Sequence, residues 1–308
     1  MSVHEAGLLS SARYLLISLR PKQWTKNLLV YMALLFSVGE TWHFRDVDSW
    51  LPLLGKTTAT FVLFCLVCSA EYLVNDIRDR ETDLLHPQKR LRPIASGRLS
   101  VATAGGWAAV LAAVGLAGSF AIEPRVGFVV LGYTGVTLAY SFYLKHVVLL
   151  DLMIIAAGFV LRAMAGAFVI DVPISPWLYV VTALGALFLA ISKRRAELVL
   201  LKEDANQHRP ILDEYTPQLL DQMASIVTAS TLVAYGLYTF TAAALPANHS
   251  MMLTTPFVLY GIFRYLYLVH ARGEGGSPEE VLLKDWPLIV DVLLWVAVSA
   301  GILALARE

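Results

Sequence analysis

Long apolar runs that are nearly free of charge recur along the 308-residue chain. Each run approaches the ~20 residues that an α-helix needs to cross a hydrocarbon core of about 30 Å. A β-barrel would show short segments of alternating polarity instead, and these runs are longer and unbroken. The pattern therefore predicts an all-α polytopic membrane protein with nine transmembrane helices, at roughly residues 27–44, 51–74, 101–121, 126–144, 147–170, 176–192, 223–245, 251–269 and 286–306.

The composition agrees with a protein that lies largely in a membrane. Hydrophobic residues make up 57% of the chain and charged residues 16%, whereas about a quarter of an ordinary globular domain is charged. A cleavable signal peptide is not expected, because the polar stretch RPKQW directly follows the short apolar stretch LLISL. We expect one transmembrane domain over residues 1–308.

Most of the 24 lysines and arginines fall on alternate connections between the predicted spans. The positive-inside rule then places the N-terminus and these connections in the cytoplasm and the C-terminus outside. We therefore expect a multi-pass protein of the plasma (inner) membrane. Its long inner loops, near residues 75–100, 193–222 and 270–285, are where active-site residues are expected, because loops carry function more often than spans do.

The first of these loops begins with a regular set of polar residues. Glu71, Asn75, Asp79 and Asp83 are four residues apart, so on a helix over 71–83 they would share one face, with Asp76 at its edge. Like charges at this spacing destabilise a helix slightly, and a bound divalent cation removes that cost. Oxygen ligands without Cys or His favour Mg²⁺, which commonly bridges carboxylates to substrate phosphates. The alternative is an acidic helix end in water, neutralised by nearby bases.

A basic loop follows the acidic residues. Lys89, Arg92 and Arg98 lie in the stretch KRLRPIASGRLS, which contains Pro and Gly. Cations on such a loop suit phosphate oxygens. Acidic residues that hold a metal beside bases that hold phosphate would form one site for a metal-bridged di- or polyphosphate.

The pair NDIRDRETD and RPIASGRLS resembles the UbiA superfamily of intramembrane prenyltransferases. This resemblance implies nine transmembrane helices around a central, lipid-open cavity. It also implies that Asn75, Asp76, Asp79 and Asp83 bind Mg²⁺ and a diphosphate, with the three aspartates as catalytic residues.

The chain departs from the superfamily where a second aspartate-rich motif is expected, after the sixth span. That place reads SKRRAELVLLKEDANQHRPILDEYT. Lys193, Arg194 and Arg195 stand where acidic residues are expected, and we take them, with Glu197 and Arg209, as substrate-binding candidates. Three adjacent cations would repel a second Mg²⁺ and would hold phosphate directly. We therefore expect one metal site.

Four further stretches resemble one actinobacterial branch of the superfamily, which attaches phosphoribosyl groups to polyprenyl phosphates in cell-wall synthesis. They are RPKQWTKNLLV, YSFYLKHVVLLD, RAMAGA and SKRRAEL. The branch implies phosphoribosyl pyrophosphate as donor, decaprenyl phosphate as acceptor, and a product used for lipid-linked arabinose and cell-wall arabinan. Membrane lipids are further partners, a homo-oligomer is possible, and no nucleic acid is expected. Either Lys89, Arg92 and Arg98 or Lys193–Arg195 would clamp the ribose 5-phosphate.

A second group of candidates lies near the fifth predicted span: Tyr140, Lys145, Asp151 and Arg162. A charged residue inside a span is a functional candidate by default, because an unpaired charge there is costly. Asp151 and Arg162 are about three helical turns apart, so both can face one interior. The alternatives are a structural pair between Arg162 and a carboxylate, and a Lys145 that only extends to the membrane surface.

The remaining candidates are Lys22 and Lys26, where the first span enters the membrane. They would contact either the acceptor phosphate or only lipid headgroups. Cys65 and Cys68 form CLVC in the second span and are expected to pack as buried small residues.

Two other functions are compatible with these features. One is an aromatic-acceptor polyprenyltransferase of the same fold, which the missing second aspartate motif argues against. The other is a carrier that binds lipid or phosphate without chemistry, although no convincing internal repeat of the transporter kind is visible.

Overall fold

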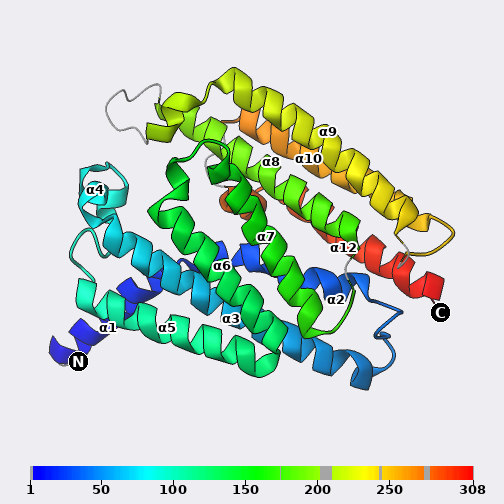
Figure 1. The fold of residues 1–308 in the computed structure, drawn as a ribbon, viewed down its shortest axis with the longest axis horizontal. Coiled ribbons are helices and arrows are strands. Elements are labelled where there is room, and N and C mark those ends of the chain that lie inside the picture. Colours follow the sequence, from blue (N-terminus) through cyan, green and yellow to red (C-terminus); the bar gives the residue numbers. More distant parts are fainter. Residues whose placement is uncertain (1–2, 174, 202–209, 243–244, 274–277, 308) are drawn as a thin grey trace.

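The computed structural model describes residues 3–173, 175–201, 210–242, 245–273 and 278–307, and in these residues the regular structure is helical apart from one isolated bridge between Val38 and Trp42 (Figure 1). The all-α prediction is confirmed. The α-helices are α1 (Val3–Ser18), α2 (Met32–Phe36), α3 (Val47–Arg78), α4 (Arg80–Leu85), α5 (Val101–Ile122), α6 (Pro124–Phe142), α7 (Leu150–Val169), α8 (Pro176–Leu201), α9 (Pro217–Thr241), α10 (Thr255–Ala271), α11 (Pro278–Lys284) and α12 (Trp286–Arg307). The 3₁₀ helices are η1 (Pro21–Tyr31), η2 (Lys89–Leu91), η3 (Leu144–His146), η4 (Pro210–Glu214) and η5 (Ser250–Thr254).

Within the described residues, seven helices are long and apolar enough to cross a membrane. They are α3, α5, α7, α8, α9, the stretch Ser250–Ala271 that contains α10, and α12. The chain is thus a multi-pass helical membrane protein, and the exact count of nine spans is not confirmed. The predicted span at 126–144 corresponds to α6, a helix of 19 residues whose Gly, Thr and Tyr residues lower its hydropathy.

The predicted span at 27–44 is wrong as a continuous helix. Its first part belongs to η1, which is followed by the five residues of α2 and then by a turn. Arg20 adopts a left-handed conformation, with φ 54°, directly before Pro21, and this separates η1 from α1. As a 3₁₀ helix, η1 has its own backbone hydrogen bonds, and it packs against α3, α7 and α11.

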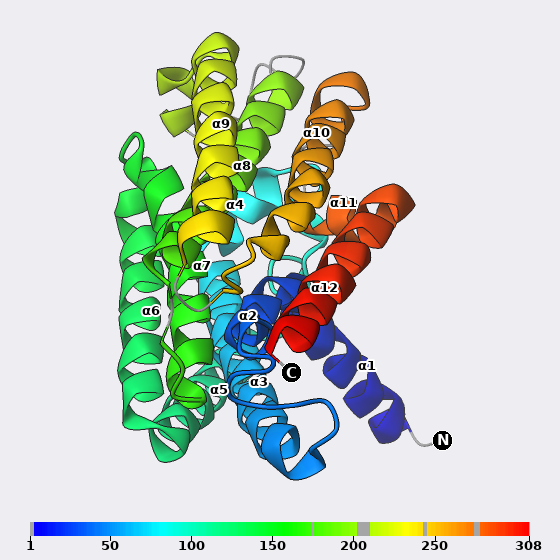
Figure 2. The ribbon, with the colours of Figure 1, turned by 90° about the vertical axis from the view of Figure 1, so that its right-hand side faces the viewer.

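The longer helices form two groups around the segment η1–α2. In Figure 1, α3, α5, α6 and α7 lie together, and α8, α9 and α10 run side by side beyond α7. α8 packs against both α7 and α9, which joins the groups, and α12 returns to pack against α2. Figure 2 shows α2 behind α12, while α1 projects away from the bundle. The N-terminal segment η1–α2 therefore lies at the centre of the fold.

A glycine in α7 allows η1 to approach closely. A Cβ atom built on Gly166 would lie 2.0 Å from the carbonyl oxygen of Val30. Real Cβ atoms do not come this close to an oxygen, so only glycine fits unless the backbone shifts. Val30 is fully buried at this contact, in the largest cluster of buried apolar residues. The stretch RAMAGA thus includes a packing residue.

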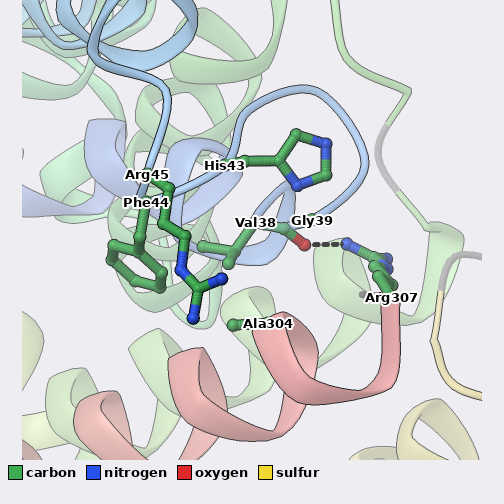
Figure 3. A pocket seen from close by; sticks show the side chains of 7 residues that line it. All are labelled: Val38, Gly39, His43, Phe44, Arg45, Ala304 and Arg307. Carbon is green, nitrogen blue, oxygen red and sulfur yellow. Dashed lines mark hydrogen bonds between the residues drawn. The ribbon is translucent and has the colours of Figure 1, made fainter.

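At the opposite end of the 32-residue α3 from the acidic residues, Arg307 ties the end of α12 to the turn after α2 (Figure 3). Its guanidinium donates to the carbonyl oxygens of Phe36 (3.3 Å) and Val38 and pairs with Glu40 (3.3 Å). Gly39 has a φ of 75°, and a Cβ there would lie 2.7 Å from Cβ of Arg307. A pocket of about 400 Å³ opens beside this contact, lined by Val38, Gly39, His43, Phe44, Arg45, Ala304 and Arg307. It is remote from the acidic loop and is not the candidate active site.

We expect Gly166→Ala to destabilise the protein by about 1–3 kcal/mol, because the added methyl group would force η1 and α7 apart. Thermal unfolding in detergent measures this. Gly132→Ala on α6 is the matched control, since a Cβ there meets nothing within 4 Å and Ala favours a helix by up to ~1 kcal/mol. Equal melting temperatures for the two variants would contradict the close approach.

Candidate active site

The acidic residues lie where α3 ends and α4 begins. Asn75 and Asp76 are in the last turn of α3, Asp79 stands between the two helices, and Asp83 is in α4. The expectation of one continuous helix over 71–83 is therefore wrong, because the helix is interrupted at Asp79. The interruption has a geometric consequence, since Asp83 reaches the site from a second helix. Asp76 and Asp83 are buried, at 2% and 4% exposure, inside this corner.

One arginine joins the two buried carboxylates. Arg92, in the loop after η2, donates from the same nitrogen to Oδ2 of Asp83 (2.7 Å) and to Oδ1 of Asp76 (3.1 Å). Asp76 and Asp83 therefore lie close enough together to share one cation. The predicted link between the acidic residues and the basic loop is observed here.

Arg20 is a member of this cluster that our sequence reasoning did not select. Its guanidinium donates to Oδ1 of Asp76 at 2.5 Å and lies 4.9 Å from the ring centre of Tyr72. The left-handed backbone at Arg20 turns the chain from α1 into η1 at this point. The only signal in the sequence was its place at the start of RPKQWTKNLLV. Two arginines thus face one buried carboxylate.

Lys145 reaches the same corner from η3. Its Nζ lies 3.6 Å from Oδ1 of Asp79, and its side chain is 14% exposed. Arg78 fixes the approach of this loop, since it donates to the carbonyl oxygens of Ser141 and Phe142 and stacks on the Phe142 ring at 4.3 Å. Lys145 therefore faces the acidic residues. It contacts Asp79 and does not only extend to the membrane surface.

Arg162 forms a separate, fully internal cluster. It donates to Oδ1 of Asn27 (2.7 Å), to the hydroxyl of Tyr133 (2.8 Å) and to the carbonyl oxygen of Gly158 (2.8 Å). Cys68 lies beside it, with Sγ 3.5 Å from the guanidinium. One guanidinium thus connects η1, α3, α6 and α7.

The residues around Arg162 bear on two expectations from the sequence: the packing of Cys65 and Cys68, and a structural pair between Arg162 and a carboxylate. Cys65 and Cys68 are buried as expected, but Cys65 accepts from Asn27 at 3.2 Å, so they are part of a polar cluster. Glu71 accepts from Thr137 of α6 at 2.6 Å. No ion pair joins Arg162 to a carboxylate in the part of the chain that is described, so the proposed structural pair is not the arrangement found.

Asp151 and Arg162 are both buried on α7, as expected, and Asp151 pairs with Arg194. Oδ2 of Asp151 lies 2.8 Å from the Arg194 guanidinium, which also donates to Glu197 at 2.6 Å. Both members of the first pair are buried, at 0% and 4% exposure. Tyr140 of α6 lies next to Arg194. The pair joins α7 to α8.

A tyrosine that the sequence did not single out completes this cluster. The Tyr215 hydroxyl donates to Oδ1 of Asp151 (2.7 Å) and accepts from the backbone N–H of Leu149 (2.9 Å). Leu149 has a φ of 66°, a conformation that costs a non-glycine residue about 1–3 kcal/mol. Burial raises the pKa of Tyr215 to about 12, so its hydroxyl stays protonated and able to donate at neutral pH.

The three adjacent cations of α8 do not share one partner. Arg194 is held inside by Asp151, whereas Arg195 pairs with Asp221 of α9, which His270 also contacts. Lys193 is half-buried. A joint phosphate clamp of all three would have to break these pairs, and the substrate-binding role of each of the three stays a prediction.

The other candidates are more dispersed. Lys22 is exposed and lies 3.8 Å from Glu280, and Lys26 is half-buried on the same 3₁₀ helix. Lys89 is half-buried in η2, and the Arg98 guanidinium lies 5.7 Å from the ring centre of Tyr14. Arg209 lies outside the described residues. Lys22 and Arg98 thus contact residues outside the acidic cluster, and the roles of all these candidates stay predictions.

Among the described residues, no three His, Cys, Asp or Glu side chains are gathered as a preformed metal site. Asp76 and Asp83 nevertheless provide two buried carboxylates that share one cation, Arg92. Such an all-oxygen set fits Mg²⁺, which usually takes one or two carboxylates from the protein and completes its shell with water and phosphate. Asn75 and Asp79 stay predictions as further ligands.

The chain resembles known proteins over nearly its whole length. A family model described as the UbiA prenyltransferase family matches residues 28–280. A curated relative named decaprenyl-phosphate phosphoribosyltransferase, from Mycolicibacterium smegmatis (strain ATCC 700084 / mc(2)155), is 38% identical over 291 residues, which cover 92% of this chain and 90% of that protein. A relative of the same name from Corynebacterium glutamicum is 37% identical over 284 residues, or 91% and 83% of the two chains.

Solved structures show the same fold. A UbiA homolog from Archaeoglobus fulgidus, bound to GPP and Mg²⁺, has a TM-score of 0.70 with 19% sequence identity. The match covers 94% of this chain and 99% of that one. At this identity the likeness concerns the fold alone.

We expect Arg162→Met to lower the melting temperature strongly, because it leaves Asn27 and Tyr133 buried without their donor, at about 1–3 kcal/mol for each unsatisfied group. Thermal unfolding in detergent is the measurement. Arg125→Met is the control, since Arg125 pairs with Glu123 and Asp171 at the surface and exposed ion pairs contribute little. A similar small shift in both variants would show that the Arg162 cluster is not a structural centre.

Proposed function

The chain belongs to the UbiA prenyltransferase family, and we propose that it transfers a 5-phosphoribosyl group from phosphoribosyl pyrophosphate to a polyprenyl phosphate and releases pyrophosphate. Curated relatives at 37–38% identity, over more than nine tenths of this chain, carry the name decaprenyl-phosphate phosphoribosyltransferase. We therefore take decaprenyl phosphate as the acceptor. The observation that carries the proposal within the molecule is the buried pair of Asp76 and Asp83 beside Arg92 and Arg20.

The residues of the corner have distinct tasks in this reaction. Asp76 and Asp83 would hold Mg²⁺, which when bound neutralises charge on the departing pyrophosphate. A cation held by both carboxylates would compete with Arg92 for them. Arg92 and Arg20 would then turn to phosphate oxygens of the donor, to which arginine is well matched. Lys145 lies beside Asp79. Its positive charge would also stabilise the negative charge on the departing pyrophosphate.

The bond changes need no general base. The bond from the anomeric carbon to the pyrophosphate oxygen breaks, and a bond forms from that carbon to an oxygen of the acceptor phosphate. A phosphate monoester is already anionic at neutral pH, so no proton has to be removed. Catalysis then rests on positioning and on electrostatic stabilisation of a positively charged ribosyl centre. Attack from the side opposite the pyrophosphate would invert the anomeric carbon.

The setting of the reaction is part of the same proposal. The acidic corner would lie at the cytoplasmic face of the plasma membrane, which the excess of Lys and Arg residues on the connections at that side supports. A polyprenyl phosphate would enter from the bilayer, and phosphoribosyl pyrophosphate from the cytoplasm. The product would serve as a precursor of lipid-linked arabinose for cell-wall arabinan.

We expect Asp76→Asn and Asp83→Asn each to lower kcat/KM for phosphoribosyl pyrophosphate by about 100-fold or more, because each removes a carboxylate that stabilises the charge of the leaving group through the metal. Chelation of divalent ions should abolish turnover of the unaltered protein. Asp171→Asn is the control, since this exposed residue lies on the connection between α7 and α8. Full activity in the presence of chelator would refute the metal-dependent mechanism.

Donor choice separates the proposal from an aromatic prenyltransferase and from a carrier. Purified protein should release pyrophosphate from phosphoribosyl pyrophosphate only when decaprenyl phosphate is present. We expect no prenylation of 4-hydroxybenzoate with a polyprenyl diphosphate as donor. Turnover of the second pair instead of the first would replace the proposed function, and binding without any product would indicate a carrier.

A further inference from the structure

The loop between α6 and α7 carries a lysine into the acidic corner but has little regular structure of its own. Lys145 lies in the single turn of η3, with Nζ 3.6 Å from Asp79. A loop of this length needs an external contact to hold a side chain in one place. Arg78 provides such a contact at the α6 end, and a second contact is found at the other end, at the start of α7.

Leu149, the last residue before α7, is held in an unfavourable conformation. Its φ of 66° and ψ of −38° are rare for any residue other than glycine. Such a backbone persists only where the surroundings determine it. Leu149 is itself 47% exposed, so the packing of its side chain does not explain it.

The Tyr215 hydroxyl makes two hydrogen bonds that hold this conformation, one to the backbone of Leu149 and one to the side chain of Asp151. It accepts the Leu149 N–H at 2.9 Å and donates to Asp151, two residues further on, at 2.7 Å. The ring of Tyr215 is buried, at 3% exposure, among apolar residues of α7, α8 and α9, which include Leu152, Ile191 and Leu220. The hydroxyl is therefore held in place by a packed core.

We propose that Tyr215 is a positioning residue, which holds the start of α7 and thereby keeps the loop that carries Lys145 against Asp79. The hydrogen bonds of its hydroxyl are with Leu149 and Asp151, so it acts through the loop and not on the substrate. This assignment rests on the proposed function for its effect on catalysis. Its structural part, the placement of Lys145, can be tested without any substrate.

A well-matched pair of variants is available. Tyr215→Phe removes one hydroxyl that makes two hydrogen bonds and keeps the ring. Tyr235→Phe is the control, because Tyr235 is also 3% exposed and its hydroxyl also has two partners, Thr254 (2.6 Å) and Trp295 (2.8 Å). Those partners lie in η5 and α12, away from the acidic corner. A merely structural role would give the same result in both variants.

The first readout is the rate at which an amine-reactive reagent modifies Lys145, followed by mass spectrometry on the substrate-free protein. We expect Tyr215→Phe to raise this rate several-fold, since the lysine leaves its 14%-exposed position, and Tyr235→Phe to leave it unchanged. Equal rates in the two variants would overturn the proposal. In the unaltered protein, the Leu149 amide should be strongly protected from hydrogen exchange, and rapid exchange there would overturn the proposal even if Tyr215→Phe failed to fold.

The second readout is kinetic. Tyr215→Phe should raise KM for phosphoribosyl pyrophosphate by about tenfold, because small displacements of positioning groups are costly. The same change should have little further effect in a Lys145→Ala background, since residues that act together are not additive. Full additivity would contradict the coupling. An unaltered protein that does not use phosphoribosyl pyrophosphate would refute the proposed function, while the labelling experiment would still decide the placement of Lys145.

Discussion

The structure depends on how its charged groups are satisfied inside a largely apolar helix bundle. A charge is buried at great cost unless it is paired and hydrogen-bonded. Three clusters of the described residues meet this constraint: Arg162 with neutral polar groups, Asp151 with Arg194, and Asp76 with Arg20 and Arg92. Each cluster joins segments that are far apart in the sequence. The same contacts that satisfy the charges therefore also hold the helices in register.

The Arg162 cluster explains how the bundle accommodates a segment that is not an α-helix. The polar side chain of Asn27 in η1 would find no hydrogen-bonding partner in lipid. Asn27 turns inward to Arg162, and Gly166 lets the backbone of η1 lie directly on α7. With η1 fixed in this way, Arg20 at its start is placed on Asp76. The internal cluster and the acidic corner are thus connected through one short segment.

The acidic corner differs from the other two clusters in what its ion pairs permit. Arg194 is 4% exposed and enclosed by its partners, whereas Arg20 and Arg92 are each 29% exposed beside Asp76. Partly exposed arginines can leave a carboxylate when another cation binds it, and the enclosed Arg194 cannot do so without unfolding the contact between α7 and α8. The enclosed pair is therefore suited to hold the scaffold, and the open one to exchange partners during a reaction.

The sequence alone determined the all-helical membrane class, the acidic motif with its basic loop, and the family, because each depends on local composition or on short motifs. It also pointed to Lys145 and Arg162 as more than surface charges. It could not reveal Arg20 or Tyr215, whose importance comes only from residues 56 and 64 positions away. Nor could it separate Arg194 from Arg195, since neighbouring side chains of a helix point to different partners. The break at η1 was likewise hidden, because an apolar run shows that a segment avoids water but not which helical form its backbone takes. Those choices were made by the tertiary structure, through contacts between distant parts of the chain.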